Sequence, residues 1–151
     1  MATIAQFQQR LSRIANKSVL EIILFIEIKR YENIFIRLNK EQLSKGEDNQ
    51  GKKLGTYKKA TEEIAKTQNP RQPKIAGQPF NFEYTGGLFD GFELRVFEKE
   101  AYFYSTDDKT DLLIGKYKGL FGLQEDNLKK VISTVILPAF ILSIRKELNL
   151  I

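Results

Sequence analysis

The stretch that decides the fold runs from Phe92 to Ser105 and reads FELRVFEKEAYFYS. Apolar and polar residues alternate over 92–96, and the set Ala101, Phe103 and Ser105 alternates with two tyrosines over 101–105. A two-residue period is typical of a strand with one face against a core. The polar residues Glu98-Lys99-Glu100 separate the two runs. We therefore predict an antiparallel hairpin with its tip at these three residues.

The hairpin belongs to an aromatic region, residues 80–106, which holds nine of the 17 aromatic residues of the chain. Three aromatic residues between 80 and 84 alternate with polar ones and predict a further strand. Both faces of the hairpin carry aromatic residues, so we expect both to be covered. The residues of this region that we expect in the core or in an oligomer interface are Tyr84, Leu88, Phe89, Phe92, Phe97, Tyr102 and Tyr104.

Residues 1–45 predict a long helix, because apolar residues recur three and four positions apart and no Pro or Gly interrupts them. Thr3 is a plausible N-cap and Gly46 a plausible stop. At 1.5 Å per residue such a helix would reach about 60 Å, so it should break or project from a domain of this size. Its middle, Val19–Ile28, is apolar around most of its circumference and requires neighbours on several sides. Other copies of the chain could supply them.

Residues 107–151 predict a helical C-terminal part with a short helix over 112–117 and a last helix that begins near Glu125. Pro138 should kink or restart that helix. We expect the compact connection before it to anchor the helix through Leu120, Phe121 and Leu123. The sequence thus predicts one α+β domain over 1–151, an antiparallel β hairpin or sheet packed with a long N-terminal helix and a C-terminal helix.

The composition excludes several classes of site. The 151 residues include no Cys and no His, which removes thiol nucleophiles, disulfides, zinc knuckles and any catalytic triad that needs His. We therefore expect no cofactor and no metal. An enzyme that uses Lys, Tyr or a carboxylate stays possible, and it would require a pocket that perturbs such a group.

A basic segment of the chain, residues 46–79, carries a short predicted helix over 57–66 within a loop rich in Gly, Asn and Pro. The net charge of +5 is mild for a nucleic-acid-binding protein. This segment could nevertheless contact DNA or an acidic partner, and a small basic nucleic-acid-binding module is the alternative function. The residues that would make this contact are Lys52, Lys53, Lys58, Lys59, Lys66, Arg71 and Lys74.

The start of the chain lacks the pattern of a signal peptide. The densest apolar run, Val19–Ile28, is interrupted by Glu21 and Glu27 and is too short to cross a bilayer. We expect no membrane partner and a chain made in the cytoplasm.

Several short motifs carry a resemblance to a known family: AGQP at 76–79, YTGGLF at 84–89, FYS at 103–105, LFGL at 120–123 and LK at 128–129. Over residues 76–148 the chain resembles the second half of virion morphogenesis or tail-completion proteins of tailed phages, which are related to head–tail connector and tail-terminator subunits. In that group a TG-L turn introduces an antiparallel strand pair, and an LFGL or FLGL segment opens the C-terminal helix. The composition, rich in Lys, Asn and Ile, is also similar to structural proteins of crAss-like phages of gut Bacteroides.

The resemblance implies a structural and non-enzymatic protein of the virion, present in the host cytoplasm during assembly. Such subunits form rings of six or twelve copies at the neck around the DNA channel, or end the tail tube. Their partners are further copies, the portal and adjacent neck or tail proteins, with non-specific contact to DNA. A ring repeats one heterologous interface around an axis, and we expect the aromatic hairpin and the apolar helices to form it.

Overall fold

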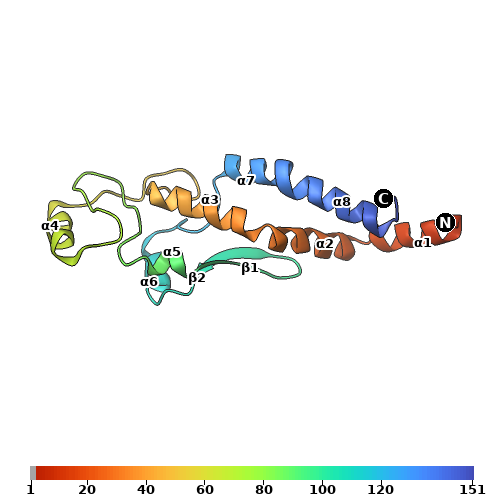
Figure 1. The fold of residues 1–151 in the computed structure, drawn as a ribbon, viewed down its shortest axis with the longest axis horizontal. Helices are drawn as coiled ribbons and strands as arrows, with labels where there is room; N and C mark the ends of the chain where they lie inside the picture. Colours follow the sequence, from red (N-terminus) through yellow and green to blue (C-terminus); the bar gives the residue numbers. More distant parts are fainter. Residues whose placement is uncertain (1–2) are drawn as a thin grey trace.

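The N-terminal part of the molecule is a row of three helices rather than one. The computed structural model describes residues 3–151 and places α1 (Ile4–Ile14), α2 (Lys17–Arg30) and α3 (Glu32–Ser44) end to end along an elongated molecule (Figure 1). The prediction of a single helix was therefore wrong in continuity, and the expected break occurs at two points. Thr3 caps α1 as predicted, with a reciprocal hydrogen bond to Gln6.

Local side-chain chemistry explains the first break. The side chain of Asn16 accepts a hydrogen bond from the backbone N–H of Ser18 at 2.9 Å and so begins α2. Asn prefers this capping position because its oxygen satisfies a backbone donor that has no partner within the helix. At the second break, Tyr31 leaves helical geometry with φ −104° and ψ 19°.

The hairpin is confirmed with the predicted bounds. Strand β1 (Phe92–Val96) pairs antiparallel with β2 (Ala101–Ser105), and Phe92 lies opposite Ser105. The prediction of a strand over 80–84 was wrong. Phe82 has a φ of +55°, which interrupts extended backbone, and this segment instead brings its aromatic rings together beside Tyr57 and Tyr117.

The C-terminal helix is continuous but contains one wide turn. It consists of α7 (Glu125–Val131), a π-helical turn η1 (Ile132–Ile136) and α8 (Leu137–Glu147). Pro138 lies in the first turn of α8, where its missing N–H and its ring are tolerated. The expected restart at this proline is confirmed, and the restart is achieved by a turn with one additional residue.

The basic segment follows α3 from Gly46, and residues 46–86, here called the excursion, connect α3 to the hairpin region. The excursion contains α4 (Lys59–Gln68), two residues later than predicted at each end, and leads into α5 (Gly87–Asp90). Isolated bridges join Glu47 to Lys53 and Thr56 to Pro79. After β2, α6 (Thr110–Lys116) occupies the place of the predicted short helix.

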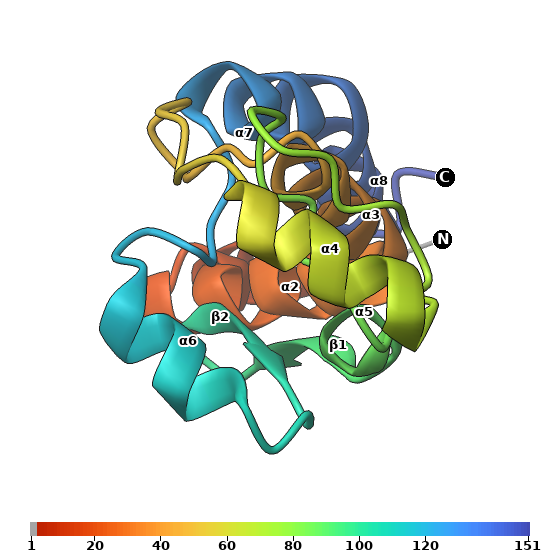
Figure 2. The same cartoon turned by 90° about the vertical axis from the view of Figure 1, so that its left-hand side faces the viewer.

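The core lies between α3, the hairpin and the start of the C-terminal helix. One cluster of buried residues comprises Leu43, Leu88, Phe89, Phe92 and Leu120. A second comprises Phe35, Leu94, Val131 and Ile136. In both views α2 and α3 run between the C-terminal helix on one side and the hairpin on the other (Figures 1 and 2). The architecture is α+β, as predicted.

Two buried amides of α3 fix the connection that precedes α7. Asn39 accepts from Gly122 N–H at 2.8 Å and donates to the Leu120 carbonyl at 3.4 Å. Gln42 donates to the Gly122 carbonyl at 2.9 Å and accepts from Gln124 N–H at 2.9 Å. The anchoring expected of this connection is thus present, and backbone hydrogen bonds provide much of it.

Candidate interaction surfaces

The apolar helix α2 is only partly covered by the rest of the described chain. Within α2, all of which the structure describes, Glu27 is the one fully buried residue, at 1% exposure. Its carboxylate accepts from the Ser143 hydroxyl at 2.6 Å and from the Arg30 guanidinium at 2.9 Å, and it thereby links α2 to α8. The apolar side chains around it are half-buried or exposed, and Ile26 is 52% exposed. The sequence predicted that this helix requires neighbours on several sides, and the described residues of one copy supply only some of them.

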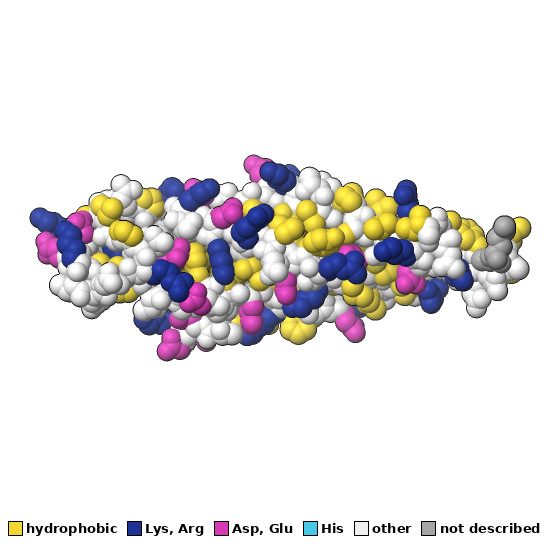
Figure 3. Space-filling model, in the orientation of Figure 1, with side chains coloured by type: hydrophobic (Ala, Val, Ile, Leu, Met, Phe, Trp, Pro, Cys, Tyr) yellow, Lys and Arg dark blue, Asp and Glu magenta, His cyan; other side chains and the backbone are white. Residues whose placement is uncertain are grey.

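The total accessible surface of the chain also indicates that one copy leaves surface for neighbours to cover. The chain exposes 9954 Å². The relation between mass and accessible surface gives about 7,900 Å² for a compact monomer of this mass, so the excess is about 2,000 Å². Figure 3 shows apolar side chains gathered along the half of the molecule that contains α8, α2 and α1. A standard protein interface removes about 800 Å² from each partner, so the excess equals roughly two interfaces.

One exposed apolar row follows the C-terminal helix. Its members, here called the C-terminal row, are Leu128, Ile132, Leu137 and Ile141. Their spacing is four, five and four residues, and the step of five coincides with the π-helical turn. Because a π turn places residues five apart above one another, the row stays on one face despite the irregular spacing. The sequence analysis did not predict this row as an exposed face, although the five-residue step from Ile132 to Leu137, just before Pro138, indicates a wide turn.

A groove lies between α2 and the tip of the hairpin. Its volume is about 460 Å³, and Ile22, Phe25, Ile26, Val96 and Phe97 form its apolar walls, with Lys29 and Glu98 beside them. We call it the α2–hairpin groove. It is the part of the molecule in which the predicted aromatic hairpin and the predicted apolar helix meet.

The predicted core or interface residues divide into three groups by burial. Four are in the core: Leu88, Phe89, Phe92 and Leu120. Four are half-buried: Tyr84, Tyr104, Phe121 and Leu123. Phe97 and Tyr102 are exposed and stack on each other with ring centroids 5.8 Å apart. The expectation that both hairpin faces are covered was therefore wrong within a single chain, because residues 3–151 leave these two rings largely exposed.

Among residues 3–151, one helix, Glu125–Glu147, is long and apolar enough to cross a membrane by length and composition alone. Only 11% of its most apolar window is buried. The densest apolar run of the sequence, Val19–Ile28, lies elsewhere, so the sequence prediction of no membrane-spanning segment did not consider this helix. Its uncharged part, however, covers 14 residues from Val131 to Ile144, or about 21 Å of helix, which is less than the roughly 30 Å of a bilayer core.

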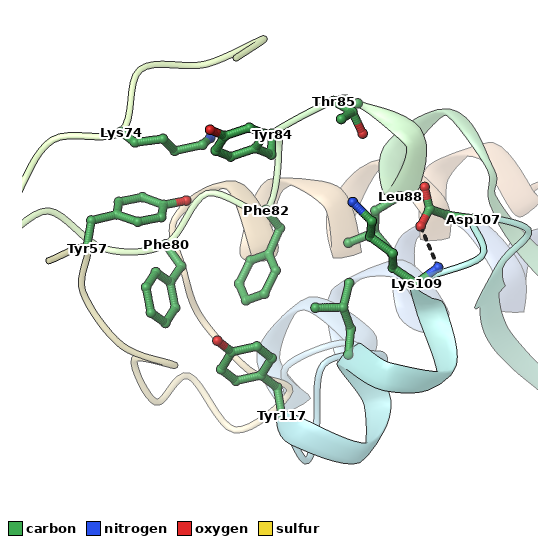
Figure 4. A pocket seen from close by; sticks show the side chains of 12 residues that line it. Tyr57, Lys74, Phe80, Phe82, Tyr84, Thr85, Leu88, Asp107, Lys109 and Tyr117 are labelled. Carbon is green, nitrogen blue, oxygen red and sulfur yellow. Dashed lines mark hydrogen bonds between the residues drawn. The ribbon is translucent and has the colours of Figure 1, made fainter. Parts of the chain in front are cut away.

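An aromatic pocket of about 240 Å³ lies where the excursion meets the body of the molecule (Figure 4). Phe80, Phe82 and Tyr117 form edge-to-face pairs with centroids 5.5 to 6.1 Å apart. Tyr57 packs on Phe80 from the side of the excursion, and Leu113 closes the pocket from α6. These contacts hold the excursion against the hairpin region.

Lys74 is buried at the edge of this pocket, at 3% exposure. Its ammonium donates to the Asn81 side chain and to the Glu83 carbonyl, the latter at 3.1 Å. The rings of Tyr57 and Tyr84 lie 5.5 and 5.6 Å from the ammonium, so both offer cation–π contacts. Burial lowers the pKa of Lys74 below its ordinary value. Its selection as a contact to DNA or a partner was wrong, because its charge faces the interior.

Three of the six other predicted basic contacts form ion pairs within the chain. Lys53 donates to Glu47, Lys66 to Glu62, and Arg71 to both carboxylate oxygens of Asp90 at 2.7 and 2.8 Å. The Arg71 guanidinium lowers the pKa of Asp90. Within the described residues 3–151, the predicted basic residues that are exposed and form no ion pair are Lys52, Lys58 and Lys59.

Comparison with known proteins gave no match to a family model, to a curated protein or to a solved structure.

Proposed function

We propose that this chain is a structural subunit of a ring-shaped homo-oligomer, and that the ring is part of the head–tail connector or the tail terminator of a tailed-phage virion. The observation that carries the proposal is the incomplete covering of α2, whose apolar side chains stay half-buried or, at Ile22 and Ile26, exposed around a single buried Glu27. Exposed apolar surface on this scale marks an interaction site.

The excess surface supports a repeated contact. Each subunit of a cyclic ring uses two different patches, one toward each neighbour. Two standard interfaces would remove about 1,600 Å² from each copy, which is close to the excess of about 2,000 Å². The molecule also presents two separate apolar patches, the C-terminal row and the α2–hairpin groove.

The assignment to a phage neck or tail rests on the resemblance of residues 76–148 to virion morphogenesis proteins. Two of the motifs that carry it occupy distinct structural positions. The TG-L turn leads into α5 directly before β1, and the LFGL segment is the connection fixed by Asn39 and Gln42 before α7. Both therefore form the junctions that set the hairpin and the C-terminal helix in place.

The mass and shape of the purified protein test the proposal. We expect light scattering to give an oligomer and negative-stain images to show closed rings with a central channel. Neutralising Lys52, Lys58 and Lys59 should leave the ring intact, because these residues lie outside both apolar patches. A monomer that binds DNA with a steep salt dependence, lost in the neutralised variant, would refute the proposal and favour the nucleic-acid-binding alternative.

A further inference from the structure

We infer that neighbouring copies join head to tail, with the C-terminal row of one copy packed into the α2–hairpin groove of the next. This inference rests on the proposed function and specifies its interface. The C-terminal row is a continuous apolar ridge because the π-helical turn brings Leu137 and Ile141 into line with Leu128 and Ile132. An apolar helix face of this kind binds by lying in an apolar groove.

The groove has the lining that such a ridge requires. Ile22 and Ile26 of α2 and Phe97 of the hairpin are exposed apolar side chains around it, at 41, 52 and 51%. Packing a second copy against them would cover exposed apolar side chains that one copy leaves open on α2 and at Phe97.

The placement of the two patches favours a head-to-tail contact. The C-terminal helix lies on one side of α2, and the hairpin lies on the other (Figures 1 and 2). Two different patches on separate sides of a subunit generate a ring or an open filament, whereas a two-fold dimer would pair one patch with itself. The row and the groove therefore match the geometry of a repeated heterologous interface.

Charges at the borders of the two patches complement each other. Glu98 and Glu100 are exposed at the hairpin tip beside the groove, and neither forms an ion pair within residues 3–151. Lys130 and Lys146 are exposed near the two ends of the row and are likewise unpaired within the described part of the chain. Opposite charges at the rim of an apolar contact fix its register.

A second copy fits the row better than a bilayer does. The uncharged part of the helix is about 21 Å long, and Ser143 on its inner side is already bonded to the buried Glu27. Full insertion into lipid would separate α8 from α2 and break the hydrogen bond from Ser143 to Glu27.

Engineered cysteines test the contact directly, because the chain contains none of its own. We would place Ile141→Cys in the row of one preparation and Ile26→Cys in the groove of another, mix them in equal amounts and oxidise mildly. The matched control replaces Ile141→Cys by Ile64→Cys, an exposed isoleucine of α4 outside both patches. We expect the row and groove pair to form intermolecular disulfides at least several-fold faster than the control pair. The double variant should give a ladder that ends at the ring size.

The outcomes separate this inference from the proposed function. An oligomeric wild type whose row and groove cysteines cross-link no faster than the control overturns the inference and leaves the ring standing. Efficient cross-linking of Ile141→Cys with itself shows a two-fold contact through the row and also overturns it. A wild type that stays monomeric in light scattering overturns both.

A charge in the row provides a second readout. We expect Ile141→Asp to weaken self-association by about tenfold or more, while Ser133→Asp, an exposed position on another face of the same helix, leaves it unchanged. Flotation of the wild type with vesicles of phosphatidylcholine and phosphatidylglycerol, lost in Ile141→Asp, would assign the row to lipid and overturn the inference.

Discussion

Substituting Gly46 by alanine should destabilise the fold far more than the same change at Gly77. Both glycines have left-handed backbone, with φ of +70° and +82°. They differ in their surroundings. A Cβ on Gly77 would meet nothing within 4 Å, whereas a Cβ on Gly46 would lie 2.6 Å from the backbone oxygen of Phe80 and 3.0 Å from Pro79. Comparing the two alanine variants therefore separates the destabilisation caused by the left-handed backbone from the destabilisation caused by steric crowding of the new Cβ.

The magnitudes follow from these distances. Alanine in the left-handed region costs about 1 kcal/mol at either site. At Gly46 a contact of 2.6 Å must open by about 0.4 Å before it reaches the shortest distance that real Cβ atoms show, and backbone must move to allow it. Overpacking of this kind adds about 1–3 kcal/mol. We expect Gly46→Ala to lower the free energy of unfolding by about 2–4 kcal/mol, against about 1 kcal/mol for Gly77→Ala.

Urea unfolding followed by circular dichroism measures both values. The protein concentration must be the same for each variant, because the proposed self-association would make the apparent stability depend on it. Limited proteolysis within 47–85 checks whether the excursion has opened by itself. Equal losses for the two variants would refute the reasoning, since they would show that Phe80 does not press against the end of α3.

Three further variants examine other features. Asn39→Ala should lower the free energy of unfolding by about 1–3 kcal/mol in the same titration, because it leaves buried backbone groups of the 120–124 connection unpaired. Burial lowers the folded-state pKa of Lys74 below its ordinary 10.5. Between the folded and the unfolded pKa the unfolded chain binds more protons, so stability rises with pH up to about pH 10.5. Unfolding measured from neutral pH to that point should show the rise, and Lys74→Met should abolish it. Deleting Thr134 converts the wide turn to an α turn, which should cost about 3 kcal/mol of thermal stability with Pro138 present and much less in a Pro138→Ala background.

The parts of the fold that the sequence predicts are those with strong local signals. The hairpin follows from a two-residue period on both sides of a polar tip, and its observed bounds agree with that pattern. The capping of α1 and the end of α3 at Gly46 follow from residue types with one preferred backbone role. The break at Asn16 carried a similar signal, since Asn before Lys17-Ser18 is a good N-cap, but the apolar pattern on both sides concealed it.

The errors arise where tertiary contacts override a local pattern. The alternation at Phe80 and Phe82 is typical of a strand, yet both rings pack on Tyr117 from a distant part of the chain. Lys74 lies among Pro and Gln in a segment with the composition of an exposed loop. Its burial depends on acceptors at Asn81 and Glu83 and on two tyrosine rings that only the folded excursion brings together.

The proposed self-association would also explain why a buried charge lies in the last turn of an apolar helix. An aliphatic residue in place of Glu27 would pack α2 on α8 in many registers, whereas the carboxylate bonds Ser143 and Arg30 and so specifies one. That one register sets the C-terminal row and the α2–hairpin groove at fixed positions on either side of α2. A closed ring needs this constancy, because a small change of angle repeated at every interface would leave the ring open. Glu27→Gln keeps an acceptor for Ser143 but weakens the attraction to Arg30, so it should broaden the distribution of ring sizes in negative-stain images while the helices remain folded.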